Sequence, residues 1–217
     1  MTDAHGTGTT DRVLHRARAY DALVWVLTRG KEERLRQRLA ELARLEHGQS
    51  VLDVGSGTGG LAFAAKGFVG AGGAVTGIDP SPEMVARAKR KAAKSGVDAR
   101  FEVATIESLP FPDTAFDAVL SSLMLHHLTE DGRRQGLAEI VRVLKPGGRF
   151  LAVDIGGANH RRRHAPFLRM GNHAHFDIDA LRPAFAAAGL RVVDGGDVGR
   201  KLVVGLSDLR YLLAERA

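Results

Sequence analysis

The segment VLDVGSGTGG at residues 51–60 joins an apolar strand, a glycine-rich turn and the beginning of a helix, and it decides the fold. Glycines in such a turn let the backbone bend sharply and let a ligand approach main-chain N–H groups closely. Gly55, Gly57 and Gly60 also fit the dinucleotide-binding pattern G-x-G-x-x-G. The segment therefore predicts a strand–turn–helix unit that binds a ligand, and by itself it leaves the ligand open.

An acidic residue after the next apolar run narrows the class of ligand. Asp79 follows the glycines at a distance of about 20 residues, where a carboxylate can accept hydrogen bonds from ribose hydroxyls. The glycines and Asp79 together predict an adenosine-containing ligand at the carboxyl ends of the strands.

Apolar runs and helical stretches alternate on both sides of the segment. The candidate strands are residues 50–54, 74–78, 100–104, 116–120 and 149–154, and the candidate helices are 58–66, 82–95 and 132–144. This alternation predicts a parallel sheet with helices on both faces. Two further runs, 190–193 and 201–206, are joined by residues 194–197 without a helix, so we expect them to pair as an antiparallel hairpin.

The composition excludes several kinds of chemistry. The 217 residues are 44% hydrophobic and 26% charged, as in an ordinary globular protein. The absence of cysteine excludes disulfides, thiolate zinc sites, iron–sulfur clusters and a cysteine nucleophile. The apolar run at 22–27 is far shorter than the roughly 20 residues of a membrane span. Residues 1–11 also lack a signal-peptide pattern, so we expect a soluble, cytoplasmic protein.

Three features distinguish the chain from dinucleotide-binding enzymes. Asp53 stands two residues before the first glycine, where those enzymes usually carry an apolar residue. The segments FDAVLSSLMLHHL at 116–128 and VLKPGGRF at 143–150 follow in order. Together these features resemble the class I S-adenosylmethionine-dependent methyltransferases, particularly the small-molecule branch that includes quinone-biosynthesis methyltransferases. The resemblance implies a Rossmann-like, doubly wound α/β sheet of seven strands, mostly parallel with an antiparallel C-terminal hairpin, and S-adenosylmethionine as the cofactor.

The resemblance also implies which residues bind the cofactor. Asp53 would orient the glycine loop and approach the amino group of the methionine moiety, and Asp79 would bind both ribose hydroxyls. Thr105 stands where the family commonly carries an Asp that accepts a hydrogen bond from adenine, and a hydroxyl can accept that bond without charge. The implied set is Tyr20, Asp53, Gly55, Ser56, Gly57, Thr58, Gly59, Asp79, Pro80, Ser81, Met84, Thr105, Ile106 and Ser121.

We interpret residues 1–217 as a single methyltransferase domain, because neither an internal repeat nor a linker rich in Pro, Ser or Gly divides them. Its expected segments are a disordered tail (1–11), a helical lid (12–47), the cofactor-binding core (48–154), a substrate-side insertion and helix (155–189), and the terminal hairpin and tail (190–217).

Two adjacent histidines are candidates for a general base. A methyl transfer from a sulfonium needs a base only if the acceptor must lose a proton, as a hydroxyl must. His126 and His127 follow the strand at 116–120, beside the expected methyl group, and imidazole suits this task. The alternative, that the pair caps the next helix or fills the core, stays open.

A second group of histidines lies in the insertion. His160, His164, His173 and His175 are interleaved with four arginines. His160 and His164 could share a helix face, as metal ligands do. However, residues 155–176 contain no acidic residue, and the arginines would repel a cation. We therefore expect no metal site and interpret the segment as a basic substrate lid or a solvated insertion.

The charge pattern bears on the acceptor. Lysine and arginine exceed aspartate and glutamate by 31 − 25 = 6, and the excess is concentrated in residues 12–44, 87–100 and 155–176. The first and third of these segments are expected to cover the acceptor pocket, so we predict a small organic acceptor and regard an anionic one as the natural candidate.

Two alternatives to this function remain. An RNA or DNA methyltransferase would fit the charge, but enzymes that methylate base amines carry an Asn/Asp-Pro-Pro-aromatic segment where this chain has SSLM at 121–124. Nucleic acid is therefore not the expected partner. The other alternative is a non-catalytic S-adenosylmethionine-binding protein, or one that makes peripheral contact with an anionic membrane through the apolar run at 23–27.

Overall fold

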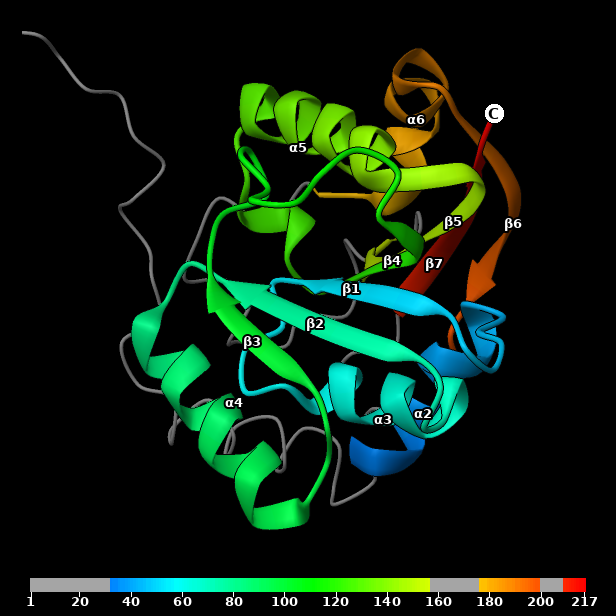
Figure 1. Cartoon of the computed structure of the whole chain (residues 1–217). Helices are drawn as coiled ribbons and strands as arrows, with labels where there is room; N and C mark the ends of the chain where they lie inside the picture. Colours follow the sequence, from blue (N-terminus) through cyan, green and yellow to red (C-terminus); the bar gives the residue numbers. More distant parts are fainter. Residues whose placement is uncertain (1–31, 157–175, 200–208) are drawn as a thin grey trace, which may run out of the picture.

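The computed structural model describes residues 32–156, 176–199 and 209–217, and these contain a sheet of seven strands in the order β3-β2-β1-β4-β5-β7-β6 (Figure 1). The strands are β1 (Ser50–Val54), β2 (Ala74–Asp79), β3 (Arg100–Val103), β4 (Phe116–Ser122), β5 (Leu144–Ile155), β6 (Leu190–Asp197) and β7 (Leu209–Arg216). Strands β1 to β5 pair in parallel, and β7 is antiparallel to both of its neighbours. The predicted doubly wound, mostly parallel α/β sheet is confirmed.

Helices cover both faces of the sheet (Figure 1). They are α2 (Glu32–Leu42), α3 (Gly60–Val69), α4 (Pro82–Ser95), α5 (Glu130–Val143) and α6 (Arg182–Ala188), with 3-10 turns η2 (Leu125–His127) and η6 (Ile178–Leu181). Successive residues of a strand point to opposite faces. Val51 of β1 accordingly packs in a core with α2, α3 and α4, and its neighbour Leu52 packs in a second core with α5 and α6.

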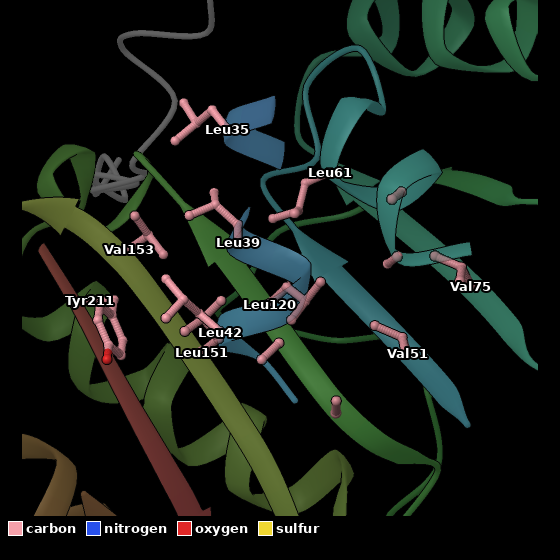
Figure 2. Packing of buried hydrophobic residues seen from close by; sticks show 14 of the residues in the cluster. Leu35, Leu39, Leu42, Val51, Leu61, Val75, Leu120, Leu151, Val153 and Tyr211 are labelled. Atoms are coloured by element: carbon pink, nitrogen blue, oxygen red, sulfur yellow. The ribbon is translucent and has the colours of Figure 1, made fainter. Parts of the chain in front are cut away.

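Helix α2 shows how the sequence pattern produces the packing. Leu35, Leu39 and Leu42 recur at helical spacing and are buried, whereas the residues between them are mostly charged. Figure 2 shows Leu39 and Leu42 directed at the sheet near Leu120 and Leu151 of β4 and β5. The amphipathic stripe therefore fixes α2 against the sheet, next to the beginning of α3.

Helix α4 has the bounds that the sequence predicts. The Ser81 hydroxyl accepts a hydrogen bond from Met84 N at 3.4 Å, and Pro82 occupies the first turn. Gly96 ends the helix with a left-handed φ of 68°. Helices α3 and α5 begin two residues away from their predicted starts, at Gly60 and Glu130.

The predicted C-terminal hairpin is wrong in its second strand. Residues 194–197, predicted as the turn, belong to β6, and β6 pairs with Leu209–Arg216 rather than with 201–206, which lies outside the described residues. The glycines fit within β6 because it is an edge strand with a register irregularity between Val192 and Asp194.

Strand β5 also begins earlier than predicted. Residues 145–148, which precede the predicted strand at 149–154, form an irregular part of β5, because Leu144 pairs with Phe116 while Arg149 pairs with Ala118. The irregularity brings the strand into parallel register with β4 over residues 149–153, up to its carboxyl end.

Candidate functional site

The candidate site lies at the carboxyl ends of the parallel strands, where the strand order reverses. The chain passes from β1 to β2 and β3 on one side, and then returns to β4 on the other side of β1. In open α/β sheets such a reversal creates a crevice in which ligands bind. The loop at residues 55–59, between β1 and α3, stands at this position.

The glycine loop adopts a conformation that depends on its glycines. Gly55, Gly57 and Gly59 have φ angles of 73°, 53° and 86°, which side-chain-bearing residues rarely adopt. An added Cβ on Gly55 would lie 2.6 Å from Met124 Cγ, and one on Gly59 would lie 2.7 Å from Phe101 Cζ. The loop is thus packed tightly between the Phe101 side chain of β3 and the segment that follows β4.

Hydrogen bonds of the Asp79 side chain connect this loop to the end of β2. Its Oδ2 accepts a hydrogen bond from Gly57 N at 2.9 Å, and its Oδ1 accepts one from Ser81 N at 2.9 Å. Burial raises the pKa of Asp79 above its usual value, and the two backbone N–H groups oppose that rise. Each carboxylate oxygen retains acceptor capacity beyond these bonds, which ribose hydroxyls could use.

Asp53 is almost completely enclosed, at 1% exposure. Burial raises its pKa to about 7, while the Ala62 N–H group and the nearby Arg36 charge lower it and Asp79 raises it. In the described part of the chain, three buried polar atoms lack a hydrogen-bond partner, namely Asp53 Oδ2, Ser56 Oγ and Ser121 Oγ. An unsatisfied buried polar atom is costly, so Asp53 Oδ2 and Ser56 Oγ near the carboxyl end of β1 indicate a site shaped for a polar ligand.

Ser121, from the implied cofactor-binding set, lies near the end of β4, but its side chain is on the opposite face of the sheet from Asp53. It pairs with Val54, which packs in the core with α5 and α6, whereas Asp53 pairs with Leu120, which packs in the core with α2, α3 and α4.

Two further residues at the loop were not predicted. Arg36 comes from α2, and its guanidinium covers Gly60, where an added Cβ would lie 1.8 Å from Cζ. Lys91 of α4 donates a hydrogen bond from Nζ to Thr58 Oγ1 at 2.8 Å. Both residues bring positive charge to the loop, and neither is close to it in sequence.

The other predicted cofactor residues surround the ends of β2 and β3. Pro80 and Thr105 are exposed, and Ser81 and Met84 are buried at the beginning of α4. The Ile106 side chain points away into the core, where it contacts Gly136 of α5. Tyr20 lies outside the described residues.

The candidate bases lie in η2, directly after β4. His126 Nδ1 is 2.7 Å from Asp154 Oδ1 at the end of β5, whereas His127 is exposed. The centroids of the two rings are 4.0 Å apart. Among residues 32–156, 176–199 and 209–217, no three His, Asp or Glu side chains gather in the way metal ligands would. The cluster from His160 to His175 lies outside those ranges.

Comparisons with known proteins identify the family. Residues 51–148 match the family described as "Methyltransferase domain". A demethylmenaquinone methyltransferase of Tropheryma whipplei is 35% identical over 171 residues, which cover 76% of this chain and 67% of that protein. The chain belongs to the class I S-adenosylmethionine-dependent methyltransferases. The resemblance seen in the sequence is therefore confirmed, and S-adenosylmethionine is the cofactor of this family.

Two other comparisons agree with this membership. A demethylmenaquinone methyltransferase of Thermus thermophilus is 38% identical over 136 residues, which cover 63% of this chain and 60% of that protein. A methyltransferase structure from Aquifex aeolicus shares the fold with a TM-score of 0.73 and 23% identity, over 93% of this chain and 97% of that one. The chain spans between 48% and 60% of the length of the first curated relatives that it matches.

None of the helices in the described residues combines the length and the apolarity that a bilayer crossing requires.

Proposed function

We propose that this chain transfers a methyl group from S-adenosylmethionine to a small organic acceptor, and specifically to a ring carbon of a reduced quinone. The observation that carries the proposal is the pair of unsatisfied buried oxygens, Asp53 Oδ2 and Ser56 Oγ, beside a glycine loop that Asp79 holds in place. The names of the relatives from Thermus thermophilus and Tropheryma whipplei support a quinone as the acceptor.

The residues at the loop suit the cofactor. The Asp53 carboxylate and the Ser56 hydroxyl can accept hydrogen bonds from the amino group of a methionine moiety, which would satisfy atoms that are otherwise unpartnered. Arg36 can attract the carboxylate of the same moiety. Asp79 can hold the ribose, with Thr105 near the adenine.

Bound S-adenosylmethionine supplies a methyl group activated by a sulfonium, which a nucleophile displaces in line. The task of the protein is to align the acceptor with this methyl group and to exclude water. The sequence leads us to expect that residues 12–47 and 155–189 contribute to the closure that would exclude water from the site at the strand ends. That closure, the single-domain organisation and the cytoplasmic location are parts of the proposal.

The direct test incubates the purified full chain with methyl-labelled S-adenosylmethionine and demethylmenaquinol that carries a short prenyl chain. We expect the product to gain one methyl group on the ring, detected by mass spectrometry. Parallel reactions with tRNA and with duplex DNA examine the nucleic-acid alternative.

Label in RNA or DNA and none in the quinol would overturn the proposed acceptor. Binding of S-adenosylhomocysteine without transfer to either class would favour the non-catalytic alternative.

A further inference from the structure

A buried carboxylate holds one of the two candidate histidines. Asp154, at the end of β5, is 0% exposed. Its Oδ1 is 2.7 Å from His126 Nδ1 and also accepts a hydrogen bond from Ile155 N at 2.8 Å. Its Oδ2 accepts one from His126 N at 3.2 Å. The same side chain therefore fixes both the backbone and the ring of His126.

This contact determines which ring nitrogen is basic. A carboxylate only accepts hydrogen bonds, so the neutral imidazole of His126 carries its proton on Nδ1. Nε2 then bears the lone pair and is the nitrogen that can take a proton from a substrate. The His126 side chain is largely enclosed, at 9% exposure, whereas Asp154 behind it is completely buried.

The pair is connected to the cofactor loop. Met124 packs against Gly55, two residues before His126. Leu123 has a left-handed φ of 55° although it is not a glycine, and its N–H group donates to Val153 O at 2.8 Å. Such a backbone conformation costs about 1–2 kcal/mol and persists where the surroundings enforce it, often at functional sites.

The other charged groups near the pair have partners of their own. Arg210 of β7 is opposite Asp154 in register and pairs with Asp179 and Asp197. Arg133 of α5 donates to the carbonyl oxygens of Leu125 and Leu128. Asp177 N-caps η6 by accepting from Asp179 N. His127 stacks on His126 from the exposed side.

We propose that His126 is the general base of the transfer, that Asp154 is its positioning residue, and that the acceptor is a compound with an ionisable hydroxyl, such as a hydroquinone. This inference rests on the proposed methyl transfer. It excludes acceptors that react as neutral amines, because those need no base before attack.

The transfer replaces a ring hydrogen of the hydroquinone by a methyl group and releases one proton. His126 Nε2 takes the hydroxyl proton, and the electrons that this releases into the ring form the bond from ring carbon to methyl. The bond from methyl to sulfur breaks, and its electron pair stays on sulfur as a neutral thioether. The ring C–H proton then moves to oxygen and restores the aromatic hydroquinone, while the imidazolium, stabilised by Asp154, returns its proton to solvent.

The first test reads the tautomer and needs no acceptor. In protein with ¹⁵N-labelled histidine, at a pH where the ring is neutral, we expect His126 to show a protonated Nδ1 and an unprotonated Nε2. His126→Gln assigns the signals, and Asp154→Asn is expected to change the tautomer populations. A His126 ring protonated on Nε2 in the unmodified protein would overturn the proposal, and this reading does not depend on the Asp154 variant.

The second test is kinetic and uses demethylmenaquinol as the probe. We expect His126→Gln to lower kcat by about 10²-fold to 10⁴-fold, to change KM little and to abolish the acid limb of the pH–rate profile. Asp154→Asn is expected to lower kcat by about 10-fold to 10³-fold. The matched control is Asp131→Asn, which changes an exposed residue of α5 outside the site.

The outcomes separate this inference from the proposed function. If S-adenosylhomocysteine does not bind, the proposed function fails. If binding and transfer are intact but His126→Gln keeps both the rate and the acid limb, or if His127→Gln loses more activity than His126→Gln, only the assignment of the base fails.

Discussion

Asp53 combines two properties that seldom occur together in one carboxyl group. It is enclosed, so its charge is opposed by burial, and it has an oxygen atom with no partner among the described residues. A cationic ligand group that filled this position would supply the missing hydrogen bond and favour the ionised carboxylate. Binding of such a group would therefore satisfy a buried oxygen that the described residues leave without a partner.

This coupling predicts proton release on binding. Because the pKa of Asp53 is raised to about 7, most molecules carry a protonated Asp53 below that pH. Binding of an amino group should expel this proton. Calorimetry of S-adenosylhomocysteine binding at pH 6, in buffers of different ionisation enthalpy, should show net proton release. The release should vanish in Asp53→Asn, and release that persists in this variant would refute the assignment to Asp53.

The same shift predicts the effect of pH on stability. An unfolded Asp ionises near pH 3.9, whereas folded Asp53 ionises near pH 7, so the folded state binds more protons between these values. Its contribution to the free energy of unfolding therefore falls as pH rises from about 4 to 7 and is constant above that range. We expect the free energy of unfolding of Asp53→Asn, minus that of the wild type, to increase with pH across this window in denaturation experiments. A difference that does not change with pH would contradict the account.

Glycine substitutions test whether the conformation of the loop at residues 55–59 matters for stability and binding. Gly55→Ala places a side chain at φ 73° and 2.6 Å from Met124 Cγ, so it should destabilise the protein by about 1–3 kcal/mol and weaken cofactor binding. Gly67→Ala is the matched control, because Gly67 lies within α3 with open space around it. That variant should be more stable by about 0.5–1 kcal/mol. Equal effects of the two substitutions in urea denaturation would count against the role of the loop conformation.

The residues of the site differ in how far the sequence reveals them. Asp53, the loop glycines and Asp79 could be predicted because each is adjacent to a strand end in a fixed sequence pattern. Arg36 and Asp154 could not, because α2 must pack beside α3, and β5 must align with β4, before either residue reaches its partner. Long-range packing, rather than local pattern, brings them to the site.

At the level of elements, the end of α5 holds the segment that follows β3. Arg142 donates hydrogen bonds to Leu109 O at 3.0 Å and to Phe111 O at 2.8 Å, and its Nε donates to Glu139 at 2.7 Å. Glu139 in turn accepts from Leu109 N at 2.8 Å, and these bonds hold its pKa below its usual value. The segment so held begins at Thr105, the predicted neighbour of adenine.

Removing this connection should affect both stability and binding. Arg142→Met leaves two partly buried carbonyl groups without their donor. We therefore expect the free energy of unfolding to fall by about 2 kcal/mol and S-adenosylhomocysteine to bind more weakly. Arg134→Met on the exposed side of α5 is the control and should change stability by about 0.5 kcal/mol or less. Thermal denaturation with and without ligand measures both effects, and an Arg142 variant that matched the control would disprove this role.

The elements themselves were predictable where the pattern is local. The strand–helix alternation and the capping of α4 follow from adjacent residues, and both appear in the structure. The second strand of the hairpin was not predictable, because the residues of β7 at 211–214 pack alternately into the two cores and are therefore buried on both faces of the sheet. Its continuous apolar residues at 211–214 lack the alternation that identifies a half-exposed strand.

At the level of the whole molecule, the two cores lie on opposite faces of the sheet, and the chain carries a formal net charge of +6. Net positive charge raises the local concentration of anionic ligands, and salt screens this effect. An anionic acceptor would benefit from the charge, whereas a neutral acceptor of the same shape would not.

Salt dependence therefore tests the charge of the acceptor. We expect kcat/KM for 1,4-dihydroxy-2-naphthoate to exceed that for uncharged 1,4-dihydroxynaphthalene at about 20 mM salt and to approach it at about 200 mM. A ratio that does not change with salt would argue against an anionic acceptor and leave the neutral hydroquinone as the substrate class.

The central claim is that the strand ends bind S-adenosylmethionine through Asp53 and Asp79. Isothermal titration calorimetry of the full chain with S-adenosylhomocysteine tests it most directly. The account predicts one site per chain and affinity losses of about tenfold or more, or about 1.4 kcal/mol, in Asp79→Asn and in Asp53→Asn, with no loss in Asp131→Asn. Absence of binding, or binding that both site variants leave unchanged, would contradict the account.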